Sequence, residues 1–566
     1  MKSDWTKARV PDALIKPTLP AGGKLRFSAR LALGAVTGLV ALPVIALIAI
    51  SVTGDFSAWP HLLAFVLPRT FLDTVFLLIL VGLGTTVLGA GTAWLTTVCR
   101  FPGHRIFTWA LVLPLAVPSY IAAYTQLEFF DFSGPIQGWI RAVGGYQSGR
   151  EYWFPDLRSL GGAALVFSTV LYPYVYMTTR LVFARQGATA LDASRSLGAK
   201  PWRMFREIGF PMARPAVAAG VALVLMETLN DIGAVEILGV KTITYAVFET
   251  WLNRDSLSGA VQLALVSLAV IIVLLVIERR ARGNRGYASG SRDRPPSRLH
   301  LRGWQAVVAF SFCTLPILIG LGVPLYILGI YALRRLDTGL DGTVLQAAFN
   351  SIQVSALSGI IATCLAFAIL QYGRISRRKV AGRIGRLMSL GYAVPGTVLA
   401  IGLLVPLAGL DNLIDGLMRD WFGISTGLLI SGTVAILVYA YVLRFVAISH
   451  GTLDTAYSRM SPHVDYAARS LGRTPLQVTT QIHIPLLRTA VATSFLLVFV
   501  DSMKELSATL LLRPFDFETL ATFVYDRASQ SALEDASWAA LAIVLIGLLP
   551  VYWLSRTVQH VQKKHL

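Results

Sequence analysis

Twelve apolar runs, each long enough to cross a lipid bilayer as a helix, constrain the fold of this chain more than any other feature. A spanning helix needs about 20 largely apolar residues, because the hydrocarbon core of a bilayer is about 30 Å thick. Runs of this length indicate an all-α polytopic membrane protein, since backbone groups in lipid must be hydrogen-bonded within their own segment. The predicted spans are 31–53, 75–97, 106–123, 160–178, 212–229, 258–277, 304–330, 350–370, 387–409, 427–446, 487–504 and 537–554.

The composition excludes a string of soluble domains. Hydrophobic residues make up 55% of the 566 residues and charged residues 14%, whereas a soluble domain has about 25% charged residues. The three cysteines, Cys99, Cys313 and Cys364, are too widely spaced for a disulfide framework or a zinc cluster. The first apolar run is too long for the core of a signal peptide and is expected to be retained as a helix.

Basic residues gather in the short connections between the apolar runs and give a formal net charge of +19. An excess of Lys and Arg in short loops marks the cytoplasmic side of a membrane protein. Every second connection is basic, so both termini are predicted to be cytoplasmic. No basic face interleaved with aromatic residues lies outside these loops, so nucleic acid is not an expected partner. The basic connections are 100–105, 180–206, 278–302, 374–386, 444–473 and 556–564.

The two halves of the chain repeat one another. Residues 192–198 (Asp-Ala-Ser-Arg-Ser-Leu-Gly) recur at 466–472 (Tyr-Ala-Ala-Arg-Ser-Leu-Gly), an offset of 274, and Pro118 matches Pro395 at an offset of 277. Because each half has an even number of helices, two parallel six-helix halves about a pseudo-twofold axis along the membrane normal are expected. The predicted regions are a cytoplasmic tail (1–30), the first half (31–278), a basic cytoplasmic linker (279–302), the second half (303–555) and a cytoplasmic tail (556–566).

A repeated cytoplasmic segment in each half, here called the coupling elbow, covers 191–211 in the first half and 465–485 in the second. Gly198 suits a left-handed helix C-cap, and Pro201 suits the first position of a following helix. Each elbow is therefore predicted to consist of two short helices that meet at a glycine. In the second elbow, Thr474 is predicted to cap the helix that follows Gly472. A plain surface loop held on the bilayer by Trp202 and arginines is the alternative, which the strict repeat disfavours.

Both elbows resemble the EAA signature of ABC importer permeases, Glu-Ala-Ala and a glycine followed by Ile-x-Leu-Pro. The resemblance implies a type I importer permease whose elbows dock on cytoplasmic ATPase subunits, expected as a dimer. Asp192 and Tyr466 replace the leading glutamate, and Asp465 beside Tyr466 is a substitute acid. The residues that carry the expected ATPase coupling are Asp192, Ala193, Gly198, Ile208, Pro211, Ala467, Ala468, Gly472, Ile482 and Pro485.

The ATPase itself is not encoded in this sequence. No G-x-x-x-x-G-K-[ST] loop occurs, and residues 21–24 (Ala-Gly-Gly-Lys) have the wrong spacing. Catalytic Ser/His/Asp and His-Glu-x-x-His motifs are also absent. The chain is therefore predicted to be no enzyme and to bind no cofactor, with ATP and magnesium held by the partner subunit.

Residues 226–240, 501–514 and 517–522 are similar to bacterial ferric-iron importer permeases, a resemblance that covers nearly the whole chain. It implies an inner-membrane subunit that receives iron from a periplasmic binding protein. Related permeases carry thiamine, polyamines, phosphonates or sulfate, and these cargoes remain alternatives.

Five carboxylates near the outer ends of the fifth and eleventh spans are candidates for the translocation path. Acidic side chains at membrane depth are costly and usually face a partner or a water-filled path, and carboxylates are hard ligands suited to a trivalent cation. Alternatively, Lys504 neutralises Glu505 or Asp501, and Asn230 and Asp231 cap the next short helix. No stable metal site is predicted. The candidates are Glu227, Asp231, Glu236, Asp501 and Glu505.

The remaining polar and aromatic residues have no metal-ligand spacing. His450, His463 and His483 lie in or near the second elbow and are expected to be surface or structural residues. Tyr120 and Tyr124 are candidate phenolate ligands for iron, but interfacial aromatics are the commoner explanation and the one expected here. A secondary transporter would also have two related halves, but it does not explain two elbows at one offset. A membrane enzyme is disfavoured by the lack of clustered catalytic groups.

Overall fold

The computed structural model describes residues 23–282, 298–336, 341–376, 385, 388 and 391–563. Within these ranges the chain is almost entirely helical, and one short parallel pair of strands is the only sheet. The predicted all-α membrane fold is confirmed. Most of the N-terminal tail, most of the linker and the last three residues lie outside the described residues.

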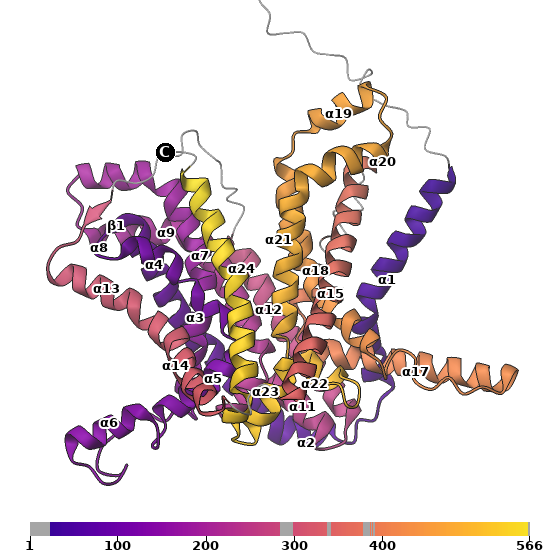
Figure 1. The fold of residues 1–566 in the computed structure, drawn as a ribbon, viewed down its shortest axis with the longest axis horizontal. Coiled ribbons are helices and arrows are strands. Elements are labelled where there is room, and N and C mark those ends of the chain that lie inside the picture. Colours follow the sequence, from indigo (N-terminus) through magenta and orange to yellow (C-terminus); the bar gives the residue numbers. More distant parts are fainter. Residues whose placement is uncertain are drawn as a thin grey trace, which may run out of the picture.

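The first half contains five long helices, α1, α3, α7, α9 and α12, and several short ones (Figure 1). Its elements are α1 (Gly23–Thr53), α2 (Trp59–His61), the π-helical turn η2 (Leu62–Val66), α3 (Leu67–Val98), β1 (Cys99–Arg100), α4 (His104–Ala110), the 3₁₀ turn η3 (Leu113–Ala116), α5 (Ser119–Phe130), α6 (Pro135–Gly144), α7 (Leu160–Ser196), α8 (Pro201–Met204), the π-helical turn η4 (Phe205–Gly209), α9 (Phe210–Asn230), α10 (Gly233–Ile237), α11 (Ile243–Leu252) and α12 (Leu257–Arg282).

The second half ends with a matching order of helices, α20 to α24 corresponding to α8 to α12, with the additional turn η7 before α24. Its elements are β2 (Leu299–His300), α13 (Trp304–Ile317), the π-helical turn η5 (Leu318–Gly322), α14 (Val323–Arg334), α15 (Gly342–Ser376), α17 (Gly396–Phe422), α18 (Val434–Arg459), α19 (Pro462–Ser470), α20 (Pro475–Val478), the π-helical turn η6 (Thr479–His483), α21 (Ile484–Met503), α22 (Ser507–Leu512), α23 (Leu520–Ser529), the 3₁₀ turn η7 (Leu533–Ala536) and α24 (Ser537–Lys563).

In the described part of the chain, ten helices are long and apolar enough to cross a membrane, and they coincide with ten of the predicted runs. The first run lies on α1, whose described apolar stretch Thr37–Thr53 is shorter. The third run is a broken pair of helices bent by 98°. The count of twelve spans therefore stays a prediction.

The bend in the third run follows from a proline. Val117 is extended, with φ −87° and ψ 118°, because the ring of a following proline disfavours helical backbone in the residue before it. Pro118 then caps α5, as Pro395 caps α17 in the second half. The two breaks direct the starts of α5 and α17 toward the centre of the molecule, where the cavity described below lies.

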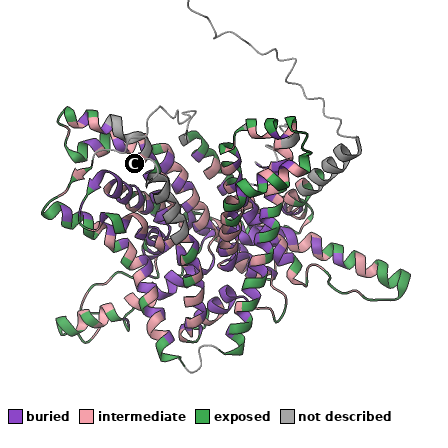
Figure 2. Ribbon diagram, turned by 45° about the horizontal axis from the view of Figure 1, so that its top comes forward, coloured by how far each residue is buried: buried purple, intermediate pink, exposed green. Residues whose placement is uncertain are grey.

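The first apolar run of each half packs against the opposite half (Figure 1). α1 contacts α17, and α14, which continues the first run of the second half, contacts α5. The approach is close, since a Cβ atom on Gly402 would lie 2.7 Å from the carbonyl oxygen of Pro43. Buried residues concentrate where the halves meet, whereas α6 and the end of α17 project from the body with many exposed residues (Figure 2).

We expect Gly402→Ala to destabilise the protein by about 1–3 kcal/mol, the usual cost of overpacking a core. The added methyl group would press on the backbone of α1 and separate it from α17. The measurement is thermal unfolding of the purified protein in detergent. Gly409→Ala on the same helix is the matched control, since nothing lies within 4 Å of its Cβ position, and equal melting temperatures for the two variants would contradict the close contact.

Candidate functional site

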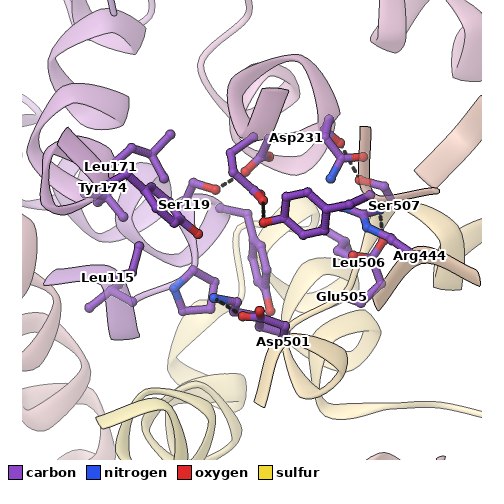
Figure 3. Close-up of a pocket in the computed structure, with 18 of the residues that line it drawn as sticks. Leu115, Ser119, Leu171, Tyr174, Asp231, Arg444, Asp501, Glu505, Leu506 and Ser507 are labelled. Carbon is purple, nitrogen blue, oxygen red and sulfur yellow. Dashed lines mark hydrogen bonds and ion pairs between the residues drawn. The ribbon is translucent and has the colours of Figure 1, made fainter. Parts of the chain in front are cut away.

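A small polar cavity of about 80 Å³ lies between the halves, where α9 and α21 end. Its walls also come from the start of α5, from α7 and α18, and from the start of α22. Figure 3 shows side chains from both halves converging on it. The charged groups that line the cavity are Glu227, Asp231, Asp501, Glu505, Arg444 and Lys504.

Asp231 and its neighbour stabilise the break between α9 and α10. One carboxylate oxygen of Asp231 accepts a hydrogen bond from the backbone N–H of Ala234 at 2.7 Å, and the other accepts one from the hydroxyl of Ser119. Asn230 bonds to the second half, because its side-chain oxygen accepts from the N–H of Gly396 at 2.6 Å. Asp231 therefore makes the hydrogen bond to the start of α10 that the sequence suggested as an alternative to lining the translocation path. It also lines the cavity.

Glu505 is the residue of the second half that aligns with Asp231 at the repeat offset of 274. Its Oε1 accepts a hydrogen bond from the backbone N–H of Ala508 at 3.0 Å and an ion-paired one from Arg444 at 2.8 Å. The two side chains are only 5% and 6% exposed. Because a buried charge needs a partner, this pair is a central electrostatic contact of the cavity.

The other two cavity carboxylates also have partners. Asp501 pairs with Lys504 at 2.8 Å, so Lys504 neutralises Asp501 rather than Glu505. Glu227 accepts a hydrogen bond from the hydroxyl of Tyr392. Glu227 and Asp231, four residues apart, both face the cavity, as their helical spacing predicts.

Glu236 does not line the cavity. It lies on α10 and accepts a hydrogen bond from the hydroxyl of Tyr525 on α23. Its contact thus joins two short helices of opposite halves outside the cavity.

Arg444 and Tyr392 line the cavity but are not among the predicted path residues, and two tyrosines lie elsewhere than the sequence predicts. Arg444 was assigned to a basic cytoplasmic connection, but it is buried within α18; an arginine inside an apolar run was the available signal. The prediction that Tyr120 and Tyr124 are interfacial is wrong. Both are buried, 3% and 6% exposed, because the break before α5 turns this helix into the protein, and Tyr120 lines the cavity.

No stable metal site is apparent among the described residues, where no three His, Cys, Asp or Glu side chains converge on one point. The cavity offers oxygen ligands instead, from carboxylates and from the hydroxyls of Tyr174 and Tyr392. These are hard donors.

The elbows lie at one end of the molecule, away from α6 and α23 (Figure 1). As predicted, Gly198 and Gly472 have left-handed backbones, with φ 78° and 74°, and Pro201 begins α8. Thr474 caps α20 in a capping box with Gln477. The prediction of two short helices is wrong for the first elbow, because α7 runs unbroken to Ser196.

The predicted coupling residues occupy the surface and the base of the elbows. Exposed apolar side chains flank the glycines at aligned positions: Leu197 and Leu471 are 87% and 81% exposed, and Trp202 and Leu476 are 69% and 72% exposed. These side chains leave an exposed apolar surface on each elbow. Of the predicted set, Ala193, Gly198, Ala467, Gly472 and Pro485 are exposed, Asp192, Ile208, Pro211 and Ile482 are half-buried, and Ala468 is buried.

We expect Arg444→Gln to destabilise the protein by about 3–5 kcal/mol, because it leaves the buried carboxylate of Glu505 without its partner. The double variant Arg444→Gln with Glu505→Gln should recover much of that loss. Denaturant unfolding of the purified protein measures both. Arg419→Gln, which breaks a pair whose arginine is 62% exposed, is the control and should cost less than about 1 kcal/mol; a loss from Arg444→Gln as small as that would contradict the assignment.

Comparison with known proteins identifies transport permeases. The chain is 27% identical to the Fe(3+)-transport system permease protein FbpB 2 of Haemophilus influenzae over 490 residues, 86% of this chain and 89% of that protein. It is 29% identical to the sulfate transport system permease protein CysW of Escherichia coli strain K12 over 196 residues, 34% of this chain and 64% of CysW. It is also 29% identical to the molybdenum transport system permease protein ModB of that strain over 194 residues, 33% of this chain and 80% of ModB.

No family model matches the chain. The relatives are permease subunits rather than enzymes, which confirms the prediction of a transport role. Together with the helical membrane fold, these matches show that the chain is a multi-pass membrane permease subunit of the ABC importer class.

Proposed function

We propose that this permease carries ferric iron, delivered by a periplasmic binding protein, across the bacterial inner membrane. The observation that carries the proposal is the charge of the central cavity. Four carboxyl groups line it against two cationic side chains, so the formal balance is two negative charges. Such a balance favours a cation over an anion in a desolvated path.

The chemistry of the cavity suits Fe³⁺ in transit. Carboxylate and phenol oxygens are the hard ligands that a trivalent cation prefers, and Glu227, Asp231 and Tyr392 present such atoms to the cavity. A transported ion must also leave, so weak and divided ligands suit transport better than a closed set. The similarity to the Fe(3+)-transport permease over most of both chains supports the same cargo.

An oxyanion is the second candidate cargo. The sulfate and molybdenum permeases also match. In addition, Nε of Arg444 is buried without a hydrogen-bond partner, so it has a free donor that an anion would accept from. Against this, Arg444 and Lys504 each already pair with a carboxylate of the cavity. An oxyanion would have to compete with these carboxylates, so iron remains the proposal.

Energy for transport is proposed to enter through the two elbows. Their exposed leucines would dock on a dimer of cytoplasmic ATPase subunits, which would bind ATP and magnesium. The basic connections share the elbow side of the predicted topology, so this end and both termini are assigned to the cytoplasm. Closure of the ATPases would draw the elbows together and shift the helices between inward-open and outward-open states.

We expect Gly472→Val to lower transport at least about tenfold, a loss within the usual range of coupling free energies, while the protein still inserts. A β-branched residue at φ 74° costs about 1–3 kcal/mol of backbone strain and would deform the elbow. The measurement is cargo uptake and ATP hydrolysis by the reconstituted importer.

Gly423→Val is the matched control for this prediction. Gly423 also has a left-handed backbone, φ 67°, and open space around its Cβ position, but it ends α17 far from the elbows. Transport should stay near the wild-type level in this variant. Equal transport by the two valine variants would remove the coupling role of the elbow.

We expect Glu227→Gln with Asp231→Asn to lower uptake of radiolabelled ferric iron at least about tenfold, the equivalent of about 1.4 kcal/mol. Both changes keep the hydrogen-bond acceptors used by Tyr392 and Ala234 and leave neither cavity cation without its partner. Uptake is measured in cells that lack the permease, with the gene restored at equal expression.

Glu236→Gln is the control, since Glu236 lies outside the cavity, and it should leave iron uptake near wild type. Sulfate, molybdate, thiamine and putrescine uptake are measured beside iron. If import of one of these were restored instead of iron import, the assignment of iron as the cargo would be wrong. If the double change left iron uptake unaltered, the proposed role of Glu227 and Asp231 in the translocation path would be wrong.

A further inference from the structure

A buried histidine ties the second elbow to the membrane helices. His483, at the end of η6, has no exposed surface. Its Nδ1 lies 2.9 Å from Oε1 of Gln371 on α15, and its Nε2 lies 2.6 Å from Oδ1 of Asp465 on α19. The imidazole ring therefore bridges a membrane helix and the leading helix of the elbow.

Arg374 completes this arrangement, which we call the elbow network. Its Nε donates to the other carboxylate oxygen of Asp465 at 2.7 Å. Its Nη atoms donate to the carbonyl oxygens of Tyr457 at 3.1 Å and Met460 at 3.3 Å, at the end of α18. Asp465 is thus held between one arginine and one histidine, and it is only 15% exposed.

The hydrogen-bond pattern fixes where the protons of the elbow network lie. The single hydroxyl hydrogen of Thr479 donates to the carbonyl of Pro475 at 2.8 Å, so Thr479 accepts from the amide of Gln371 at 2.6 Å. The amide oxygen of Gln371 therefore faces the other way, where the hydroxyl of Tyr457 donates to it at 2.7 Å. An amide oxygen only accepts, so Nδ1 of His483 must carry a hydrogen.

The second ring nitrogen needs a proton as well. Nε2 of His483 faces the carboxylate of Asp465, and an ionised carboxylate is also an acceptor only. The other oxygen of this carboxylate accepts a charge-assisted hydrogen bond from Arg374, so Asp465 is an acceptor toward both partners. The elbow network is complete only when the imidazole is doubly protonated and positively charged.

The first elbow has no such group at the aligned positions. The indole of Trp94 packs edge-on against Phe183 at 5.4 Å and Phe205 at 5.2 Å between ring centroids. A Cβ atom on Gly209 would lie 2.5 Å from that indole. At the repeat offsets of 277 and 274, the aligned pairs are Trp94 and Gln371, Thr97 and Arg374, Phe183 and Tyr457, Leu191 and Asp465, Phe205 and Thr479, and Gly209 and His483.

We propose that His483, Asp465 and Arg374 form a proton-dependent tie that makes coupling through the second elbow, and not the first, respond to cytoplasmic pH. The inference rests on the proposed coupling role of the elbows. These three are positioning residues, since they act on the orientation of α19 and not on the cargo.

The direction of the effect follows from the proton count. Histidine is the side chain whose charge ordinarily changes between about pH 5 and 8. The tie is complete at low pH; as pH rises and the ring loses a proton, a lone pair faces either Asp465 or Gln371 and one hydrogen bond is lost. The groups that face the ring are Asp465 from α19, Gln371 from α15 and Tyr457 from α18, and Arg374 reaches it through Asp465.

The test uses the assembled importer, permease with its ATPase subunits, in lipid nanodiscs. Hydrogen exchange of α19 is followed from about pH 6 to about pH 8.5, corrected for the intrinsic exchange rate. We expect α19 to open about tenfold more often at the upper end, the effect of losing one charged hydrogen bond. The first elbow, 191–211, is the internal control and should not change.

Two variants distinguish an effect of protonating His483 from an effect on the folding of the elbow. His483→Gln retains a donor for Asp465 but does not titrate, so exchange of α19 should no longer depend on pH. If that variant fails to assemble, the second elbow is rebuilt with the apolar residues of the first. This variant carries Q371W, R374T, Y457F, D465L, T479F and H483G, and it should also be independent of pH.

Permease-stimulated ATP hydrolysis is measured on the same samples, with the ATPase subunits alone as the reference for their own pH profile. A fall in stimulation that parallels the opening of α19 in wild type, and is absent from the variants, supports the proposal. A flat exchange profile in wild type, or the same profile in the variants, overturns the tie. Opening of α19 without any change in stimulation overturns the link to coupling, while the Gly472→Val result judges the coupling role itself.

Discussion

The need to satisfy backbone hydrogen bonds inside a membrane protein shapes the centre of this molecule. Helices α9 and α21 end within the protein, where lipid offers no partners and each unpaired group costs several kcal/mol. Asp231 and Glu505 accept the N–H groups of Ala234 and Ala508 at these breaks, and the hydroxyl of Ser507 donates to the carbonyl of Asn230 across the two halves. The carboxylates that permit the breaks are thereby placed around one cavity.

The charged side chains that line the cavity therefore also hold the surrounding helices in place. Glu505 is at once the partner of a backbone N–H and of Arg444, and Asp501 is paired with Lys504. Pairing lowers the cost of burying each acid, yet four acids face only two cations. The remaining negative charge is what a cationic cargo would meet on its way between the halves.

The duplicated elbows show how one backbone design can have two kinds of support. The first elbow rests on aromatic packing around Trp94, whereas the second rests on an ionic network around His483. Apolar packing is insensitive to pH, and a network that needs a charged imidazole is not. Two elbows with the same shape can thus respond differently to the cytoplasm.

Apolar run lengths, basic connections and the 274-residue repeat were enough to predict the helical membrane fold, the glycine caps and the acids at the ends of two spans, because these depend on local backbone preference and on the thickness of the bilayer. Sequence alone did not place Arg444, Tyr392 or Tyr120 in the cavity, separate Glu236 from it, or show that His483 and Asp465 meet. Those contacts join residues tens to hundreds of positions apart. Helix packing within the second half brings His483 to Asp465 and Arg444 to Glu505, and the packing of one half against the other, with the breaks before α5 and α17, completes the cavity.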